Sequence, residues 1–336
     1  MTDSVDWLEG LIRRDPARRG LAGHEQSPLC AGHLGAAAHD LADRAAVVGI
    51  VTGFAVPLDE GPVAETDGPP GAVMLAEIFS RLGARVWLIT DDPCRGALEA
   101  GRNFTGLSDV PVISCPVDPD DATPCLDRLW TDEWGESLTH LIAIERIGPS
   151  HTPRSLAAQP RSGPAPLKEF ERLVPPEDRD RHHTMRGEIM DASTAPLHQL
   201  FDEADRREAV RTVGICDGGN ELGMGTLLWE DVSRRLPEPI GPRIVCRTRT
   251  DWTIIGGTSN WGGFALAAAT ALKAGRIDLI DSWTVERMSN LLEDLVAHGP
   301  AVDGCTRRHE ATVDGLPFET FIQLWVEIRH RVGLES

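Results

Sequence analysis

The chain has 336 residues, 41% of them hydrophobic, which suits one large α/β domain with additions. Its formal net charge of −19 disfavours nucleic acid and anionic membrane surfaces as partners, because both carry negative charge themselves. No apolar run approaches the ~18 residues of a membrane-spanning helix, and the N-terminus has no apolar stretch typical of a secretory signal.

Seven cysteines are scattered along the chain, and no two of them form a Cys-x-x-Cys pair. This spacing indicates neither a zinc knuckle nor a disulfide framework. We therefore expect a reduced, cytoplasmic protein.

Predicted elements alternate between helix and strand along the chain. Residues 1–45 are expected to form an N-terminal helical extension with a pair of helices. Continuous apolar runs then predict buried strands, at 47–54, 84–90, 110–116, 138–146, 211–217, 243–248 and 252–257. Helical patterns fall between and after these runs, at 72–83, 93–103, 120–134, 220–236 and 260–275.

This alternation favours an α/β fold with a doubly wound, mostly parallel Rossmann-like sheet and helical N- and C-terminal additions. The α/β catalytic domain is expected to cover residues 46–275. A C-terminal helical segment, 276–336, is expected to pack on the same domain, and packing on a second subunit of a homodimer is the alternative. Residues 148–187 are too long and proline-rich for a simple connection, which is typical of a lid or of a disordered loop.

Polar residues gather where the predicted strands end. In a sheet of this class, ligands bind beyond the carboxyl ends of the strands, where the strand order reverses. The segments 65–72, 144–148, 182–187, 217–225 and 256–263 are therefore expected to converge on one edge. The candidate site residues that they carry are Glu65, Thr66, Asp67, Gly68, Glu145, Arg146, Arg186, Asp217, Gly218, Gly219, Asn220, Glu221, Ser259 and Asn260.

One of these stretches, GICDGGNELGMGT at 214–226, is rich in glycine and yet acidic. A P-loop would continue with lysine and a hydroxyl residue after Gly223, whereas Met224 and Gly225 follow here. The stretch also lacks a GxGxxG dinucleotide fingerprint and the ligand spacing of an EF-hand. Glycines let a backbone approach a ligand closely, and helix N-termini bind carboxylates, so the loop suits a small polar ligand.

Each feature also has a purely structural interpretation. Asp217 can cap the helix that follows, and Glu221 can be an acid favoured in a first helical turn. Arg146 can pair with a nearby acid, and His182 and His183 can be surface residues of a mobile loop. The coincidence of polar and glycine-rich sequence at successive strand exits favours the functional interpretation.

Six motifs resemble those of the D-glutamate cyclase family. They are TGF (52–54), ETDGPPGA, IAIERIG, HHTMRG, GICDGGNELGMG and TSNWGGFALAAA, in the family's order over roughly residues 47–275. The resemblance implies a lyase of the family's stand-alone bacterial form, which converts the small-molecule substrate D-glutamate to 5-oxo-D-proline and water. Two positions depart from the family pattern: His182-His183 replace a pair of tyrosines, and Cys216 replaces a glycine.

The implied reaction needs a base for the ammonium group, neutralisation of the γ-carboxylate and a substrate held in a curled conformation. We expect Asp217 or Glu221 to bind and deprotonate the amine, with Glu145 as a further catalytic carboxyl. Arg186 or Arg146 would pair with a substrate carboxylate.

Backbone groups are expected to bind the other carboxylate. The predicted helix starts at Gly219–Asn220 and Ser259–Asn260 would supply N–H donors for it. The remaining substrate-binding positions are expected at Thr66, Asp67, Gly68 and Gly218.

Several carboxylates so close together would repel one another unless they are protonated, paired or bound to a metal. A divalent Mg²⁺ or Mn²⁺ ion held by Asp67, Glu145, Asp217 and Glu221 is one solution, and raised carboxyl pKa values are the other. Two alternative functions stay open. One is a metal-dependent hydrolase or lyase acting on another small acid, and the other is a non-catalytic protein that binds a small amino acid.

Overall fold

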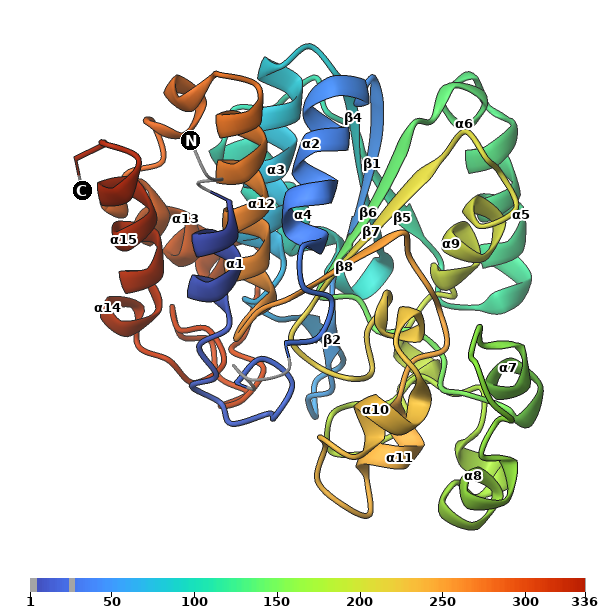
Figure 1. Ribbon diagram of the computed structural model, residues 1–336. Helices are drawn as coiled ribbons and strands as arrows, with labels where there is room; N and C mark the ends of the chain where they lie inside the picture. The colour runs from blue at the N-terminus through green and yellow to red at the C-terminus, as the bar shows by residue number, and fades with distance from the viewer. Residues whose placement is uncertain (1–4, 24–27, 336) are drawn as a thin grey trace.

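Six of the seven predicted strands form one sheet in the computed structural model, which describes residues 5–23 and 28–335 (Figure 1). These strands are β1 (Val47–Thr52), β4 (Arg85–Asp91), β5 (Val112–Cys115), β6 (His140–Ile144), β7 (Arg211–Cys216) and β8 (Trp252–Ile255). All neighbours are parallel, in the order β5-β4-β1-β6-β7-β8. This Rossmann order confirms the predicted doubly wound sheet, and it reverses between β1 and β6.

Helices cover both faces of the sheet (Figure 1). On one face, α12 (Ser259–Lys273) packs against α3 (Pro69–Arg81) and α2 (His33–Arg44), and α13 (Val285–His298) packs against α4 (Arg95–Phe104). The other face carries α5 (Pro119–Thr131), α6 (Glu133–Ser137) and α9 (His198–Ala204). The strands are apolar throughout because alternate side chains enter different cores: Val48 and Ile50 enter one, and Val47 and Val51 the other.

The two ends of the chain meet on the α12 face. There α1 (Asp6–Ile12) and α15 (Gln323–Arg331) contact each other and α12, and the short α14 (Phe318–Phe321) precedes α15. Residues 1–4 and 24–27 of the predicted N-terminal extension, and Ser336, lie outside the described residues. Within the described ranges, no helix is long and apolar enough to cross a membrane.

Two glycines allow the first turns of α3 and α12 to approach each other closely. A Cβ atom added to Gly263 would lie 3.0 Å from the Cα atom of Gly71 and 2.8 Å from a methyl carbon of Ile144. Any larger residue would force the helices apart. The N-termini of both helices therefore lie together above the point where the strand order reverses.

Two predicted elements are wrong. No helix covers the whole of 220–236, and α10 spans only Trp229–Ser233. Gly223, within the predicted helix, adopts a left-handed conformation (φ 114°) that a continuous α-helix does not allow. The strand predicted at 243–248 is replaced by α11 (Gly241–Ile244), whose second residue, Pro242, favours a helix start. Cys246 makes only an isolated bridge to Ser150.

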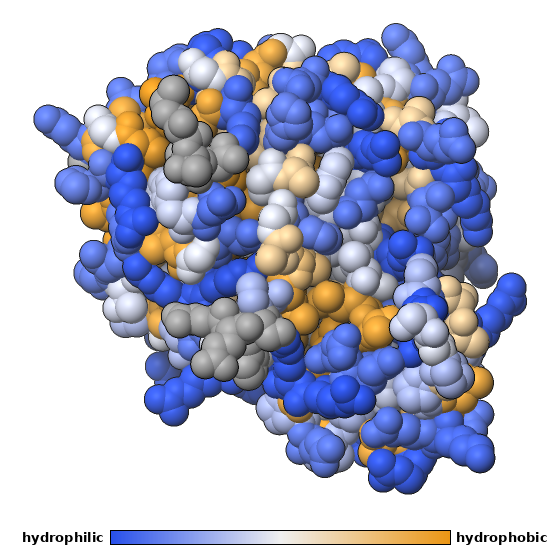
Figure 2. All heavy atoms as spheres, in the orientation of Figure 1, coloured by the Kyte–Doolittle hydropathy of each residue, from blue (hydrophilic) through white to orange (hydrophobic). Residues whose placement is uncertain are grey.

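The proline-rich interruption at 148–187 contains two helices, α7 (Pro153–Ala158) and α8 (Leu167–Leu173). Phe170 of α8 is buried and contacts Trp229 of α10 edge to face. These helices lie with α10 and α11 below the carboxyl edge of the sheet (Figure 1). Most of the molecular face in Figure 2 is hydrophilic, in keeping with the many charged residues of the chain.

Candidate active site

A cavity of about 150 Å³ opens at the carboxyl edge of the sheet, beside the reversal between β1 and β6. This volume suits a ligand smaller than the drug-sized molecules that fill clefts of roughly 300–1,000 Å³. Its apolar walls include Phe54, which follows β1, and Val56 of β2 (Ala55–Val56), which pairs with β3 (Val63–Ala64). Met185 adds a third apolar wall from the segment after α8.

The inner end of the cavity is acidic. Glu65 follows β3, Glu145 follows β6, Asp217 follows β7, and Asp314 comes from the loop between α13 and α14. All four are buried, and each has one carboxyl oxygen without a hydrogen-bond partner in the structure. Unpaired buried carboxyl oxygens of this kind point to a cation or a proton that the site is built to receive.

The backbone of Glu145 is held in an unusual conformation. Its φ of 46° is left-handed, which residues other than glycine rarely adopt and which is enriched at functional sites. Gly68, with φ 95°, lies directly against it: a Cβ atom at Gly68 would come within 2.7 Å of the Glu145 Cβ atom. Glycine at position 68 therefore leaves room for the Glu145 side chain, and this placement does not require contact between Gly68 and a substrate.

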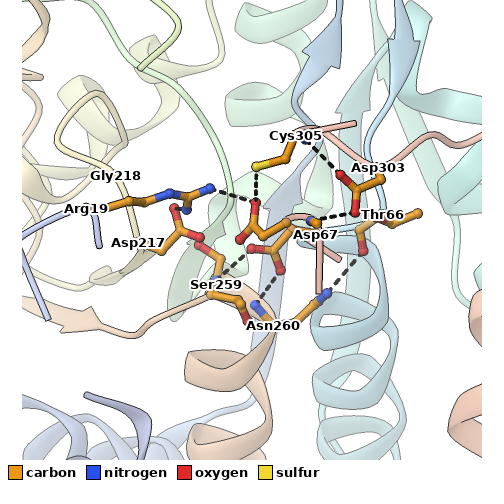
Figure 3. A network of polar contacts seen from close by, with 12 residues as sticks. Arg19, Thr66, Asp67, Asp217, Gly218, Ser259, Asn260, Asp303 and Cys305 are labelled. Carbon is orange, nitrogen blue, oxygen red and sulfur yellow. Dashed lines mark hydrogen bonds and ion pairs between the residues drawn. The ribbon is translucent and has the colours of Figure 1, made fainter. Parts of the chain in front are cut away.

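Asp67 lies beside the cavity and caps α12 (Figure 3). Its carboxylate accepts hydrogen bonds from the backbone N–H groups of Ser259 (2.8 Å) and Asn260 (2.7 Å). The Asn260 side chain in turn accepts from the N–H groups of Gly68 (3.1 Å) and Gly71 (2.9 Å) at the start of α3. The N–H donors predicted to bind substrate at Ser259–Asn260 are thus already paired within the protein.

Thr66 is tied to the C-terminal part of the chain. Its hydroxyl donates to the carbonyl of Thr312 (2.6 Å), and its N–H donates to the carbonyl of Val302 (2.8 Å). Thr66 does not line the cavity, and it anchors the loop that carries Asp314.

Glu221 holds the acidic glycine loop together. Its carboxylate accepts from the N–H groups of Asp217 (3.1 Å) and Gly218 (2.5 Å) and from the Ser259 hydroxyl (3.2 Å). A Cβ atom at Gly218 would lie 2.5 Å from the Asn220 side-chain oxygen, so a larger residue there would displace the Asn220 side chain. Glu221 is consequently a buried loop residue that does not line the cavity.

The helix start predicted at Gly219–Asn220 is wrong, because turns and no helix occupy these residues. Gly219 packs against Leu236, whose methyl carbon would lie 2.5 Å from an added Cβ atom. Asn220 donates its amide to the carbonyl of His183 (2.7 Å), and its side-chain oxygen is buried and unpartnered. Of the predicted loop residues, Asp217 and Asn220 are the two that line the cavity.

Arg146 points away from the cavity. Its guanidinium is 1% exposed and forms an ion pair with Asp91 at the end of β4 (2.6 Å). It also donates to the carbonyls of Gly53 (2.8 Å) and Ala195 (2.7 Å). These contacts join the exits of three strands next to Glu145. They do not support the prediction that Arg146 pairs with a substrate carboxylate.

Three residues that the sequence did not single out complete the site. Arg19, from the loop after α1, lies beside Asp217 in Figure 3. It pairs with both Asp217 and Asp314 (2.6 Å to the latter). Asp314 and Arg307 come from the loop between α13 and α14. Two Val-Asp-Gly repeats, at 302–304 and 313–315, are the only local signal for that loop, and nothing in the sequence around Arg19 indicates its role.

Arginines lie at the mouth of the cavity. Arg186 is exposed there, and its guanidinium forms no hydrogen bond or ion pair with any residue in the described ranges. Arg307 is half-buried and pairs with Glu188 (3.1 Å). The cavity therefore carries negative charge at its inner end and positive charge at its opening.

Burial raises the pKa values of the carboxyl groups in the site. Burial is the main cause of a pKa of about 6 for Asp217 and about 7 for Asp314, although the Arg19 guanidinium acts in the opposite direction on both. Burial and the negative charge of neighbouring carboxylates raise the pKa values of Glu65 and Glu145 well above their usual range. The site thus gathers acids that hold or exchange protons near neutral pH.

Three carboxyl groups could hold a metal ion. Asp67, Glu145 and Asp217 each offer one oxygen, and these oxygens lie within 4.8 Å of one another. Glu221, the fourth predicted ligand, is not in this group, because its oxygens are taken by the N–H and hydroxyl donors described above.

His182 and His183 are buried, so their prediction as surface residues is wrong. His182 bonds through Nδ1 to Asp191 (2.9 Å), and His183 bonds through Nε2 to the carbonyl of Asp178 (2.9 Å). Neither residue lines the cavity, whereas Thr184, Met185 and Arg186 directly after them do.

Comparisons with known proteins show which family the chain resembles. Residues 8–161 and 170–329 match the family model described as D-glutamate cyclase-like, C-terminal. Over 270 residues, 78% of this chain, the sequence is 32% identical to the human mitochondrial D-glutamate cyclase. The chain spans 38% of the length of that human protein.

Proposed function

The chain belongs to the D-glutamate cyclase-like family, and on that premise we propose that it is a lyase that converts D-glutamate to 5-oxo-D-proline and water. The observation that carries the proposal is the charge distribution of the cavity, with buried carboxyls inside and arginines at the mouth. An amino acid that carries a second carboxylate can place its ammonium group at the buried carboxyls and a carboxylate at the arginines of the mouth.

The chemistry sets what the site must supply. The amine nitrogen attacks the γ-carboxyl carbon, a C–N bond forms, and a C–O bond breaks. Two protons leave the ammonium group, and both finish on the departing oxygen, which leaves as water. The site therefore needs one carboxylate that accepts protons from nitrogen and a neighbouring carboxylic acid that delivers them to oxygen.

We assign binding and deprotonation of the substrate amine to Asp217. Its Oδ1 atom pairs with Arg19, its Oδ2 atom is buried and unpartnered, and the residue lines the cavity. The Arg19 charge beside it favours the ionised form that a base requires. Glu221, the other predicted base, is engaged by backbone donors and lies outside the cavity wall.

We assign proton delivery to Glu145. Its Oε2 atom is also buried and unpartnered, and one of its carboxyl oxygens lies within 4.8 Å of an Asp217 oxygen. A curled substrate can therefore present its amine to one carboxyl group and its γ-carboxyl to the other. Apolar walls from Phe54, Val56 and Met185 keep water from competing for these hydrogen bonds.

A divalent metal ion also fits the carboxyl groups. Asp67, Glu145 and Asp217 would hold it, and oxygen ligands of this type suit Mg²⁺ and Mn²⁺. When bound, the ion would supply positive charge that neutralises a substrate carboxylate. Asp217 and Glu145 would then be its ligands, and the base and acid roles assigned to them above are those of the metal-free site.

The direct test is incubation of the purified protein with D-glutamate and, separately, L-glutamate. Formation of 5-oxoproline is followed by chiral chromatography in the presence of EDTA and in the presence of added Mn²⁺. We expect 5-oxo-D-proline from D-glutamate. If D-glutamate is not consumed in either condition by protein whose circular dichroism shows it to be folded, the cyclase assignment is wrong.

The same samples separate the alternative functions. A thermal shift with D-glutamate but no product would identify a non-catalytic binder of amino acids. Turnover of a different small acid, lost in EDTA and restored by Mn²⁺, would identify a metal-dependent hydrolase or lyase.

A further inference from the structure

The loop between α13 and α14 places Arg307 at the mouth of the cavity in a fixed position. The carboxylate of Asp303 accepts hydrogen bonds from the N–H groups of Cys305 and Thr306 (both 2.8 Å), from the Thr312 hydroxyl and from the Gly315 N–H (both 2.7 Å). Figure 3 shows the contact between Asp303 and Cys305. One buried carboxylate thus closes this loop on itself and orders the turn that carries Arg307.

Arg307 has an unused hydrogen-bond donor at that position. Its N–H donates to the carbonyl of Asp303 (2.7 Å), and its φ is 60°, a left-handed conformation that the closed loop imposes. One guanidinium nitrogen, Nη2, pairs with Glu188, whereas Nε is buried and has no hydrogen-bond partner. Arg307 lines the cavity, so this buried N–H without a partner can serve as a donor to a bound ligand.

Arg186 faces the same opening from a different part of the chain. It follows α8, it is exposed, and it lines the cavity together with Arg307. Two guanidinium groups at one mouth match a carboxylate, because each offers planar, charge-assisted donors. The buried carboxyl groups occupy the opposite, inner end, so the amine of a ligand is favoured inward and a carboxylate that keeps its charge is favoured at the mouth.

We propose that Arg307 and Arg186 together bind the α-carboxylate of the substrate and thereby select α-amino acids and their cyclised products. The proposal rests on the proposed function, which assigns the amine and the γ-carboxyl to the inner carboxyl groups. The α-carboxylate is the one anionic group that the reaction leaves unchanged, so it can stay at the mouth from substrate to product. Arg307 is then a specificity-determining residue contributed by the C-terminal segment.

The test measures binding and does not need turnover. 5-Oxo-D-proline and 2-pyrrolidinone are matched probes, because they share the lactam ring and differ only in the carboxylate. Their affinities are measured by titration calorimetry on the full-length protein and on the variants Arg307→Gln, Arg186→Gln and Arg308→Gln. Arg308 is the matched control, since it is exposed, pairs with Glu310 and does not line the cavity.

We expect Arg307→Gln and Arg186→Gln each to weaken binding of 5-oxo-D-proline about tenfold or more, as for loss of a charge-assisted hydrogen bond. Binding of 2-pyrrolidinone should stay as in the wild type, and Arg308→Gln should change neither ligand. Arg307→Lys keeps the charge without the planar fork and should fall between wild type and Arg307→Gln.

Several results would overturn the proposal. They are an unchanged affinity for 5-oxo-D-proline in both variants, an equal loss for the two probes, and no measurable binding of 5-oxo-D-proline to the wild type. Failure of the proposed function has a different signature, which is absence of product from D-glutamate. Arginine-dependent binding without turnover would keep the carboxylate site and remove the cyclase.

Discussion

Asp67 and Asn260 cap each other's helices. Asp67, just before α3, accepts from the first N–H groups of α12, and Asn260, in the first turn of α12, accepts from the first N–H groups of α3. Two helix N-termini that face the site are thereby satisfied from within the protein. The exchange also fixes the relative position of two strand exits, because α3 follows the β1 side of the sheet and α12 follows β8.

Replacement of Asn260 by alanine should destabilise the fold. The variant Asn260→Ala leaves the buried N–H group of Gly71 without an acceptor, and the Gly68 N–H keeps only its bond to Asp67, which costs about 2 kcal/mol of the free energy of unfolding. Urea unfolding followed by circular dichroism measures the loss. The exposed Asn290 of α13 is the matched control, and Asn290→Ala should change stability by less than ~0.5 kcal/mol. Equal stability of the two variants would contradict the capping role.

Replacement of Arg19 should lower the free energy of unfolding, because the buried carboxyl groups around it repel one another. Arg19→Gln leaves Asp217 and Asp314 without their shared cation, and we expect a loss of about 2 kcal/mol in the free energy of unfolding. This figure is below that for a fully buried pair, because the Arg19 side chain is partly exposed.

A double variant separates charge from packing at the same place. Asp314→Asn added to Arg19→Gln removes one of the unpaired charges and should recover part of the lost stability. Arg18→Gln, at the exposed neighbouring residue, should leave stability near that of the wild type. Additive losses from the Arg19 and Asp314 changes would show that the two side chains do not interact.

Replacement of Asp217 tests the proposed base. Asp217→Asn keeps the size of the side chain and removes its ability to accept a proton, so kcat with D-glutamate should fall by roughly 10²-fold or more. Asp231→Asn, on the exposed face of α10, is the control and should keep wild-type turnover. Retained turnover in Asp217→Asn would assign the base to another residue, with Glu145 as the next carboxyl group to replace.

A buried histidine should make the fold sensitive to acid. Burial, with the nearby Arg247 and Arg161 charges, lowers the pKa of His151 to about 3, and its Nε2 atom has no hydrogen-bond partner. Between that value and the usual histidine pKa of about 6.5, the unfolded chain binds a proton that the folded chain does not. The His151 contribution therefore falls as pH falls below about 6.5, and it is fully present above that pH.

The measurement compares the wild type with His151→Gln by urea unfolding at several pH values. The difference in free energy of unfolding should change by about 1.4 kcal/mol per pH unit between pH 6 and pH 5, with the wild type losing more. Above pH 7 the difference should be constant. A difference that does not vary from pH 5 to pH 8 would show that His151 titrates alike in both states.

Local sequence patterns predicted the sheet well because the cause of a buried parallel strand is itself local. A run such as VVGIVT must have apolar residues on both faces when helices cover both sides, and six of seven such runs are strands. The seventh, at 243–248, shows the limit: a short apolar run has no periodicity that separates strand from helix, and Pro242 decides for a helix start.

Within the candidate site, sequence spacing predicted which strand exits gather but not which way their side chains face. Asp217 and Glu145 line the cavity, whereas Glu221, only four residues from Asp217, turns back to its own loop. Arg146 follows Glu145 directly and yet pairs with Asp91 on another strand. Neighbours in sequence differ because successive side chains leave the backbone in different directions.

The sequence by itself determined the α/β class, the alternation of strand and helix, and hence the edge of the sheet where polar loops collect. Only the tertiary structure decided which polar groups remain free there. Asp67 accepts hydrogen bonds from the N-terminus of α12. Three other site residues come from the two ends of the chain: Arg19, Arg307 and Asp314. The physical reason is that secondary structure follows from nearby residues, whereas the partner of a charge is set by distance through space.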